Sequence, residues 1–328
     1  MWRDFSDNSR DDAEKVAKFL GIELVVLDVK EKFKTEIVDE FIREYELART
    51  PNPCVICNRQ IKFFEIIKKA KELGCELVAS GHYARVFNQK IFDKEIEENH
   101  SEYNDGKTHL ARGVDKDKDQ SYMLYRLSEA ELNDLYFPLG DLRKIEVREM
   151  ANKFNIPVAE AKESQEICFT KKNYRDFYSD QGGEMAEKGG NIELKSGEII
   201  GKHEGIFNYT LGQRKGVNQD FLKGEAEREK LYVTKLDVKN NKVVVSSDED
   251  VFFTEVAIKN TNWIKKVDES KKYLVQVRYK HKGEMAKIRF DKEGGAKLEF
   301  EKPVRAAMAG QSAVLFDGEE VVGGGIIE

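Results

Sequence analysis

The hydrophobic pattern of this 328-residue chain changes near residue 170, and this change constrains the fold more than any other feature. Before it, helical patterns alternate with short runs rich in β-branched residues. Such alternation predicts a doubly wound α/β sheet, whose ligands bind at the carboxyl ends of its strands. The expected helices are 10–20, capped by Ser9, then 32–45, 61–73, 120–135 and 143–154, and the expected strands are 23–29, 76–80 and 108–113.

Beyond residue 170, glycine-rich turns separate short alternating runs, and these predict two small β-rich domains, the last a β-barrel. We expect a nucleotide-binding α/β domain over residues 1–169, a central β-rich domain over 170–249 and the barrel over 250–328. A polar, acidic segment, 88–107, is expected to be a mobile insertion. The predicted strand runs are 198–200, 230–233, 242–245, 274–279, 287–290 and 313–316.

Composition narrows the classes of protein that fit. The length favours two or three domains, and the 35% charged share favours a soluble surface. No run of 18 apolar residues is present, and no apolar stretch follows a basic start, so neither a membrane span nor a secretory leader is expected. With four cysteines, this predicts a reduced, cytoplasmic protein. The net charge of −6 hides a basic region, residues 255–308, where 14 Lys and Arg meet 8 Asp and Glu, and such a region can contact phosphates.

Two cysteines, Cys57 and Cys168, stand in unusual polar settings far apart in the sequence. Cys57 follows a loop stiffened by two prolines, and a helix is expected to begin near Asn58. A helix N-terminus, with Arg59 and Lys62 nearby, would lower the pKa of Cys57 and favour its thiolate. Two such thiols in a reducing compartment favour sulfur chemistry over a structural disulfide.

Cys54 and Cys57 also form a C-x2-C pair, which leaves two other interpretations open. A zinc site would need a second pair of ligands at comparable spacing, and neither Cys75 nor Cys168 belongs to one. A dithiol redox pair would be expected soon after a first strand, at a helix start. His82 lies at the end of a predicted strand, where the Gly81-His82 turn would admit a ligand closely.

A series of strings in the chain resembles the tRNA-specific 2-thiouridylase family, which places sulfur on the wobble uridine of certain tRNAs. The matches run in order along nearly the whole chain: RTPNPCVICNRQIKF at 49–63, SGHYARV at 80–86, RGVDKDKDQSYMLY at 112–125, FPLGDLRKIEVR at 137–148, SQEICF at 164–169, YTLGQRKG at 209–216, NW at 262–263, VRYK at 277–280 and GQSAVLFDGEEVVGGGIIE at 310–328. So many long, ordered matches are specific to one family.

The resemblance implies an adenine nucleotide hydrolase-like domain and a sulfur-transfer mechanism. The family adenylates the C2 oxygen of uridine with ATP and Mg²⁺, and a soft sulfur nucleophile then displaces the activated oxygen. Cys168 matches the cysteine that receives persulfide sulfur from a donor protein. Cys57 matches the nucleophile or partner thiol, which forms a transient disulfide with Cys168. Cys54 falls where many members have Asp, so its pairing with Cys57 is expected to be incidental.

Binding residues carry over by motif as well, and none of them is a metal ligand. Asn52, Pro53 and Cys54 match the segment that meets the flipped target base. Gly81 matches an adenosine contact. The expected tRNA contacts are His82, Lys118, Asp119, Gln120, Arg278, Tyr279 and Gln311, in keeping with RNA recognition by shape and by stacked bases.

One departure from the family pattern affects the expected activity. Family members open with a strand and an S-G-G-V-D-S-type pyrophosphate loop, and no such string occurs here. We expect that the true start lies upstream of Met1, that the enzyme is ATP-dependent, and that the chain as printed binds ATP very weakly because the phosphate cradle is missing. The alternatives are a catalytically dead tRNA-binding remnant and a redox or zinc protein built on Cys54 and Cys57.

Overall fold

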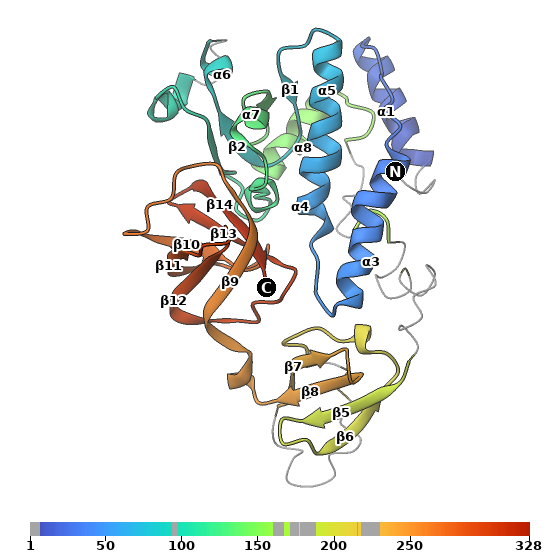
Figure 1. Cartoon of the computed structure of the whole chain (residues 1–328). Helices are drawn as coiled ribbons and strands as arrows, with labels where there is room; N and C mark the ends of the chain where they lie inside the picture. The colour runs from blue at the N-terminus through green and yellow to red at the C-terminus, as the bar shows by residue number, and fades with distance from the viewer. Residues whose placement is uncertain are drawn as a thin grey trace.

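The computed structural model describes residues 7–93, 98–159, 167–170, 177, 188–214, 216–217 and 230–328. Figure 1 shows three bodies: a helix-rich N-terminal part, a β-barrel beside helix α4, and a smaller β-domain next to the lower end of helix α3. This arrangement confirms the predicted fold class of an α/β domain followed by two β-rich domains. Among the described residues, no helix is both long and apolar enough to cross a membrane.

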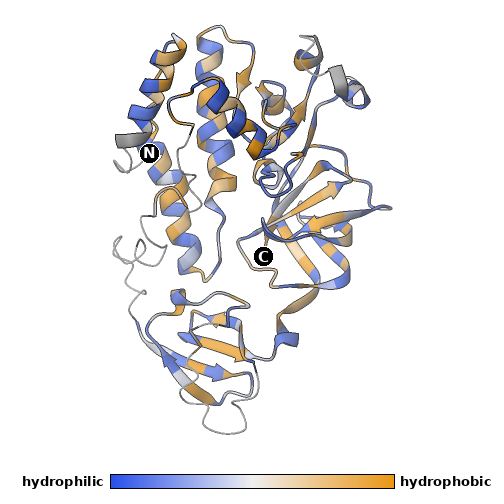
Figure 2. Cartoon of the chain, turned by 180° about the vertical axis from the view of Figure 1, so that it is seen from behind, coloured by the Kyte–Doolittle hydropathy of each residue, from blue (hydrophilic) through white to orange (hydrophobic). Residues whose placement is uncertain are grey.

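Helices dominate the N-terminal part because their apolar positions recur at helical spacing. They are α1 (Asp7–Leu20), α2 (Lys30–Phe33), the π-helical η1 (Lys34–Val38), α3 (Asp39–Glu46), α4 (Pro53–Cys57), the π-helical η2 (Asn58–Phe63), α5 (Phe64–Glu72), α6 (Gln89–Asp93), α7 (Glu129–Leu132) and α8 (Lys144–Lys153). In Figure 2, hydrophobic and hydrophilic residues alternate along these helices, as amphipathic packing requires. The helical patterns predicted over 32–45, 61–73 and 143–154 are thus confirmed.

The parallel sheet of this part is much smaller than the sequence predicts. It is the pair β1 (Val78–Ala79) and β4 (Leu135–Tyr136), in parallel register. The strand expected over 23–29 is wrong: the segment forms no ladder with any described residue, and Ile22 and Val26 are both 60% exposed. A β-branched run forms a strand only against a neighbouring strand that supplies its hydrogen bonds, and no described strand pairs with this run.

Two further local predictions are corrected. Residues 120–135 do not form one helix: a 3-10 turn, η4 (Ser121–Leu124), is followed by α7, because Ser128 caps a new helix with Glu131 in a capping box. The insertion at 88–107 is packed where it is described, since Ile91 is fully buried and Tyr103 stacks on Phe87 at 4.2 Å.

The central domain is a four-stranded sheet in the order β6-β5-β8-β7. Its strands are β5 (Gly190–Leu194), β6 (Ile199–His203), β7 (Tyr232–Asp237) and β8 (Lys242–Ser246). Val233, Val243 and Val245 are fully buried and belong to the same apolar cluster as Phe33 and Phe41 from the N-terminal helices. The central domain therefore shares a core with the first part.

The C-terminal region closes into a six-stranded barrel, because β13 pairs with both β10 and β14. Its strands are β9 (Phe252–Trp263), β10 (Lys272–Gln276), β11 (Glu284–Phe290), β12 (Ala296–Arg305), β13 (Ser312–Asp317) and β14 (Glu320–Ile327). The hairpin β2 (Ala84–Phe87) and β3 (His109–Arg112) extends this sheet through the pair Glu320 and Ala111. The barrel is thus fastened by hydrogen bonds to the N-terminal part.

Candidate functional site

A cavity of about 730 Å³ lies where the N-terminal part meets the barrel, and it gathers most of the predicted site residues. This volume is in the range of small-molecule and cofactor sites. Nine of the predicted residues line it: Asn52, Pro53, Cys54, Cys57, His82, Lys118, Gln120, Cys168 and, from the barrel, Tyr279. Gly81, Asp119, Arg278 and Gln311 are not among its lining residues.

Cys57 is held in a continuous helical stretch that runs from Pro53 through α4, η2 and α5. Pro53 occupies the first turn, where its missing N–H costs nothing. Cys57 is therefore one turn inside the helix and only 6% exposed. The expected lowering of its pKa by a helix N-terminus is wrong: burial raises the pKa of Cys57 to about 12.

Cys168 contrasts with Cys57 because its residue is exposed while it lines the same cavity. Burial of its sulfur nevertheless raises the pKa of this thiol as well, and Lys62 opposes the rise. Phe169, the next residue, is 3% exposed and packs edge-on against Phe33 and Phe41. This anchor holds Cys168 at the cavity wall, open to a partner on one side.

Two amides and a methionine shape the wall beneath the prolines. Asn58 is 4% exposed, and its Nδ2 donates to the backbone oxygen of Met123 at 3.1 Å. Asn52 Nδ2 lies 3.4 Å from the sulfur of the same Met123. The Oδ1 of Asn58 is buried and has no hydrogen-bond partner among the described residues.

The barrel fixes the loop that precedes Cys54. Gln311 Nε2 donates to the backbone oxygen of Thr50 at 2.7 Å, and Thr50 N donates to Ala309 O at 2.8 Å. Gly310 has φ +88°, and a Cβ there would lie 3.1 Å from the Thr50 backbone. Gln311, predicted as a tRNA contact, thus positions the loop in this structure.

His82 is held neutral in the cavity wall. Its Nδ1 lies 2.8 Å from Ser80 Oγ, and its ring contacts Phe63 and Phe137. Burial, and to a lesser extent the charge of Lys62, lower the pKa of His82 to about 4. At neutral pH the ring is therefore uncharged, and it can take part in hydrogen bonds but does not attract an anion by charge.

Residues 117–120 form a loop, called here the recognition loop, in which neighbouring residues have different contacts. Lys118 and Gln120 line the cavity, and Gln120 exchanges two hydrogen bonds with the backbone of Tyr83. Asp119 is 9% exposed, and its carboxylate accepts bonds from Gly113 N and Ser121 N, both at 3.0 Å. Asp119 therefore holds the loop in shape while its neighbours face the cavity.

The two barrel residues also differ from each other. Tyr279 lines the cavity and lies 6.0 Å, ring to ring, from Tyr122 of the N-terminal part. Arg278 Nη1 donates to the backbone oxygen of Arg305 at 2.8 Å, which fixes the guanidinium within the barrel.

The cavity is electropositive. Among the described residues of its lining, Asp117 is the one carboxylate, whereas four lysines contribute to the wall: Lys62, Lys118, Lys144 and Lys280. Anionic ligands such as phosphates are therefore favoured. Within the part of the chain that the structure describes, no group of three or more His, Cys, Asp or Glu could hold a metal ion.

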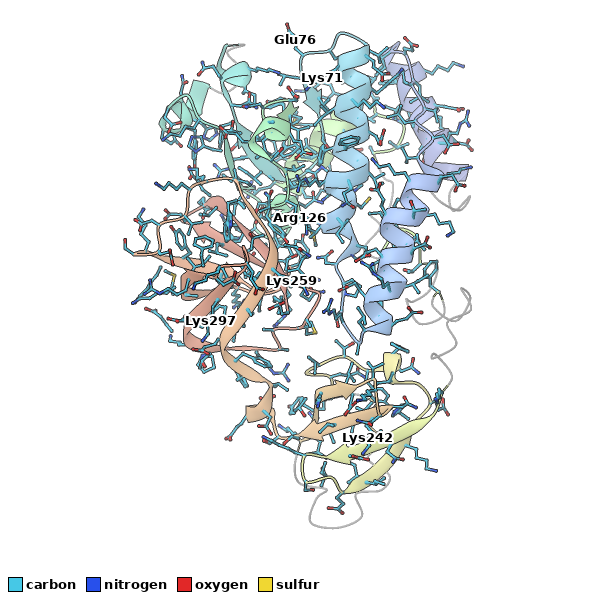
Figure 3. The ribbon with its side chains drawn as sticks, viewed as in Figure 1. Lys71, Glu76, Arg126, Lys242, Lys259 and Lys297 are labelled. Carbon is cyan, nitrogen blue, oxygen red and sulfur yellow. The ribbon has the colours of Figure 1, made fainter. Side chains whose placement is uncertain are left out.

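A second cavity of about 380 Å³ adjoins the first at Asn52. Figure 3 shows two of its basic residues, Arg126 and Lys259, one above the other at the boundary between the barrel and helix α4. Three glutamates from the N-terminal helices also line it, and they balance its three basic residues. It is a polar neighbour of the site with no excess of one charge.

Comparisons with known proteins match all three parts of the chain. Residues 4–172 match the family described as "tRNA methyl transferase HUP domain", 176–247 its "PRC-barrel domain", and 253–327 an "Aminomethyltransferase beta-barrel domain". A protein of Thermoanaerobacter sp. called "tRNA-specific 2-thiouridylase MnmA 2" is 42% identical over 319 residues, which are 97% of this chain and 82% of that protein. The chain belongs to the tRNA-specific 2-thiouridylase family.

Other members give the same result. "tRNA-specific 2-thiouridylase MnmA 1" of Caldanaerobacter subterraneus is 43% identical over 97% of this chain and 82% of its own length. The protein of Halothermothrix orenii called "tRNA-specific 2-thiouridylase MnmA" is 39% identical over 98% and 85%. The predicted resemblance is confirmed.

Several residues that line this cavity were not predicted from the sequence. Asn58 and Met123 line it, yet their side-chain contacts arise between α4–η2 and the turn η4, far apart in sequence. Lys144 is the first residue of helix α8; the sequence predicted this helix but gave no role to Lys144. No local signal in the sequence identifies these side chains, because their role depends on the packing of distant segments.

Proposed function

We propose that this chain thiolates the wobble uridine of tRNA at C2, with Cys168 as the persulfide carrier and Cys57 as its partner thiol. The observation that carries the proposal is the single cavity that both cysteines line. Their unequal burial supports unequal roles, because the exposed Cys168 is open to a sulfur-donor protein and the buried Cys57 is shielded from it. The names of the relatives specify tRNA and 2-thiouridine.

The proposed chemistry starts with activation of the base. The uridine O2 attacks the α-phosphate of ATP, pyrophosphate leaves, and O2 becomes part of a phosphate ester that departs as AMP. ATP is consumed as a substrate, and the cavity volume and its lysines suit a nucleotide. Gly81, beside His82, is the proposed adenosine contact. Because Asp117 is the only carboxylate of the lining, the described residues do not by themselves fit a magnesium site, and no step here passes through the metal.

Sulfur transfer then uses both thiols. The terminal sulfur of the Cys168 persulfide attacks C2, and AMP leaves with the electrons of the C–O bond. The Cys57 thiolate attacks Cys168 Sγ, the S–S bond to the transferred sulfur breaks, and 2-thiouridine and a Cys57–Cys168 disulfide result. If Cys57 attacks first, hydrosulfide is released and displaces AMP, with the same disulfide. A thiol reductant and the donor protein then restore the persulfide.

RNA recognition would combine loop and barrel. Residues 52–54 meet the flipped base, which must leave its stack to be modified. The Tyr279 ring offers a stacking face, and Lys118 and Gln120 offer polar contacts at the cavity. Asp119, Arg278 and Gln311 would act indirectly, by holding in place the loops that carry the RNA-contacting side chains.

Complementation tests the proposal. In cells lacking wobble-uridine thiolation, the full-length protein should restore 2-thiouridine, whereas its Cys57→Ala and Cys168→Ser variants should restore none and retain tRNA binding within about threefold. Cys75→Ser is the matched control, because Cys75 is exposed and does not line the cavity. Normal thiolation by either cavity variant would overturn the assignment. A wild-type chain that binds tRNA without thiolating it would favour the binding remnant.

A further inference from the structure

Lys62 reaches the cavity because the helix changes its pitch after Cys57. In an α-helix, residues i and i+5 lie about 140° apart around the axis. A π turn closes i→i+5 hydrogen bonds and so brings residue i+5 back over residue i. The π-helical turn Asn58–Phe63 therefore places Lys62 on the face of Cys57, and both line the cavity.

The charge of Lys62 acts on every thiol of the cavity. Burial is the largest influence on the pKa of Cys57 and of Cys168 and raises both, whereas Lys62 is the largest influence that lowers them. Lys62 also lowers the pKa of Cys54, against burial and the nearby Cys168, and it helps burial to lower the pKa of His82. The other lining lysines have no such effect on these thiols.

Among the residues that the structure describes, Lys62 has no counter-ion. Within the described residues it forms no salt bridge, and it is exposed where it lines the cavity. The acidic side chain of the lining, Asp117, belongs to the recognition loop. The titratable and charged groups that face this space are Cys54, Cys57, His82, Tyr83, Asp117, Lys118, Lys144, Cys168, Tyr279 and Lys280.

We infer that Lys62 is the positioning cation for sulfur in this site: its ammonium group favours the anionic sulfur of Cys168 and Cys57 and holds it at the cavity wall. The inference deepens the proposed function, since a persulfide or thiolate must persist while the base is activated. Its physical basis is a property of the free chain, so it can be tested without tRNA or ATP.

The test measures thiol alkylation residue by residue. Wild-type chain and variants are treated with iodoacetamide from about pH 7 to pH 10, and peptide mass spectrometry gives separate rates for Cys57, Cys168 and Cys75. Lys62→Met should raise the pH midpoint for Cys168 and slow its alkylation near pH 7.5 about threefold. Lys62→Arg should retain most of the wild-type rate.

Three controls separate this effect from a change in structure. Cys75 is exposed and away from the cavity, so its rate should not change in any variant. Lys68→Met removes an exposed lysine of the same helix that does not line the cavity, and it should leave Cys168 unchanged. Raising the salt to about 1 M should shrink the difference between wild type and Lys62→Met, because exposed charges are screened.

The outcomes are decisive in either direction. An unchanged Cys168 profile in Lys62→Met would overturn the inference, and so would an equal slowing of Cys75. If Lys62→Met weakened tRNA binding with no change in alkylation, the ammonium would serve a phosphate and the inference would fail. A normal Lys62 effect in a chain that never thiolates tRNA would sustain the inference and sink the proposed function.

Discussion

The barrel and the N-terminal part differ in how much of their backbone is paired in sheets. The barrel closes six strands on themselves, and Val275, Ile288 and Leu315 inside it are fully buried. The N-terminal part has a two-residue parallel pair and leaves Ile22 and Val26 exposed. A closed sheet is rigid by its hydrogen bonds, whereas helices and loops can bring distant side chains to one point.

The site uses both properties. Its thiols and amides lie on the helices and turns of the N-terminal part, and the barrel holds the loop before them through Gln311 and Thr50. The candidate reactive side chains thus lie in the N-terminal part, which has little sheet, while the barrel holds the loop that precedes them in place. This difference between the two regions can be tested with substitutions that affect one region and leave the other unchanged.

The largest expected effect on stability is in the barrel. Leu315→Ala removes a fully buried side chain and should lower the free energy of unfolding by about 3 kcal/mol, through lost burial and the cavity that remains. Leu24→Ala is the matched control in the exposed N-terminal segment, where Leu24 is 39% exposed, and it should change stability by less than about 0.5 kcal/mol. Denaturant unfolding followed by Trp263 fluorescence measures both, and equal losses would refute the contrast.

In the N-terminal part, we expect His82 to make the free energy of unfolding depend on pH in the acid range. Its pKa in the fold is about 4, below the ordinary 6.5, so the unfolded chain binds more protons between these values. The stability contributed by neutral His82 is present above about pH 6.5 and is lost as the pH falls towards 4, on the order of 3 kcal/mol. His82→Gln should remove this part of the slope in unfolding curves at several pH values. A variant slope equal to the wild-type slope would contradict the prediction.

The smallest expected effect lies where the two regions meet. Tyr279→Ala should weaken tRNA binding by about 1–3 kcal/mol through loss of a stacking face, with thiol reactivity unchanged. Tyr279→Phe keeps the ring and should bind within about twofold. Filter binding at fixed salt distinguishes them; similar weakening by both variants would assign the effect to the hydroxyl instead of the ring.

Local patterns in the sequence were sufficient for the helices over 32–45, 61–73 and 143–154 and for the barrel, because their hydrophobic periods and turns are local properties. They failed over 23–29 and at Cys57. A strand needs a neighbour that the segment itself does not encode, and the helix around Cys57 begins at Pro53 instead of Asn58. The pKa of a thiol depends on burial by distant segments, which no local pattern reports.

The sequence by itself determined the family and singled out Cys57 and Cys168 as the candidate thiols, because nine ordered strings and the placement of four cysteines can be read without coordinates. Only the tertiary structure decided that Cys57 is buried and Cys168 exposed, that a π turn turns Lys62 towards both, and that Gln311 holds a loop. The physical reason is range: composition and periodicity act along the chain, whereas burial, electrostatics and hydrogen bonding act through space.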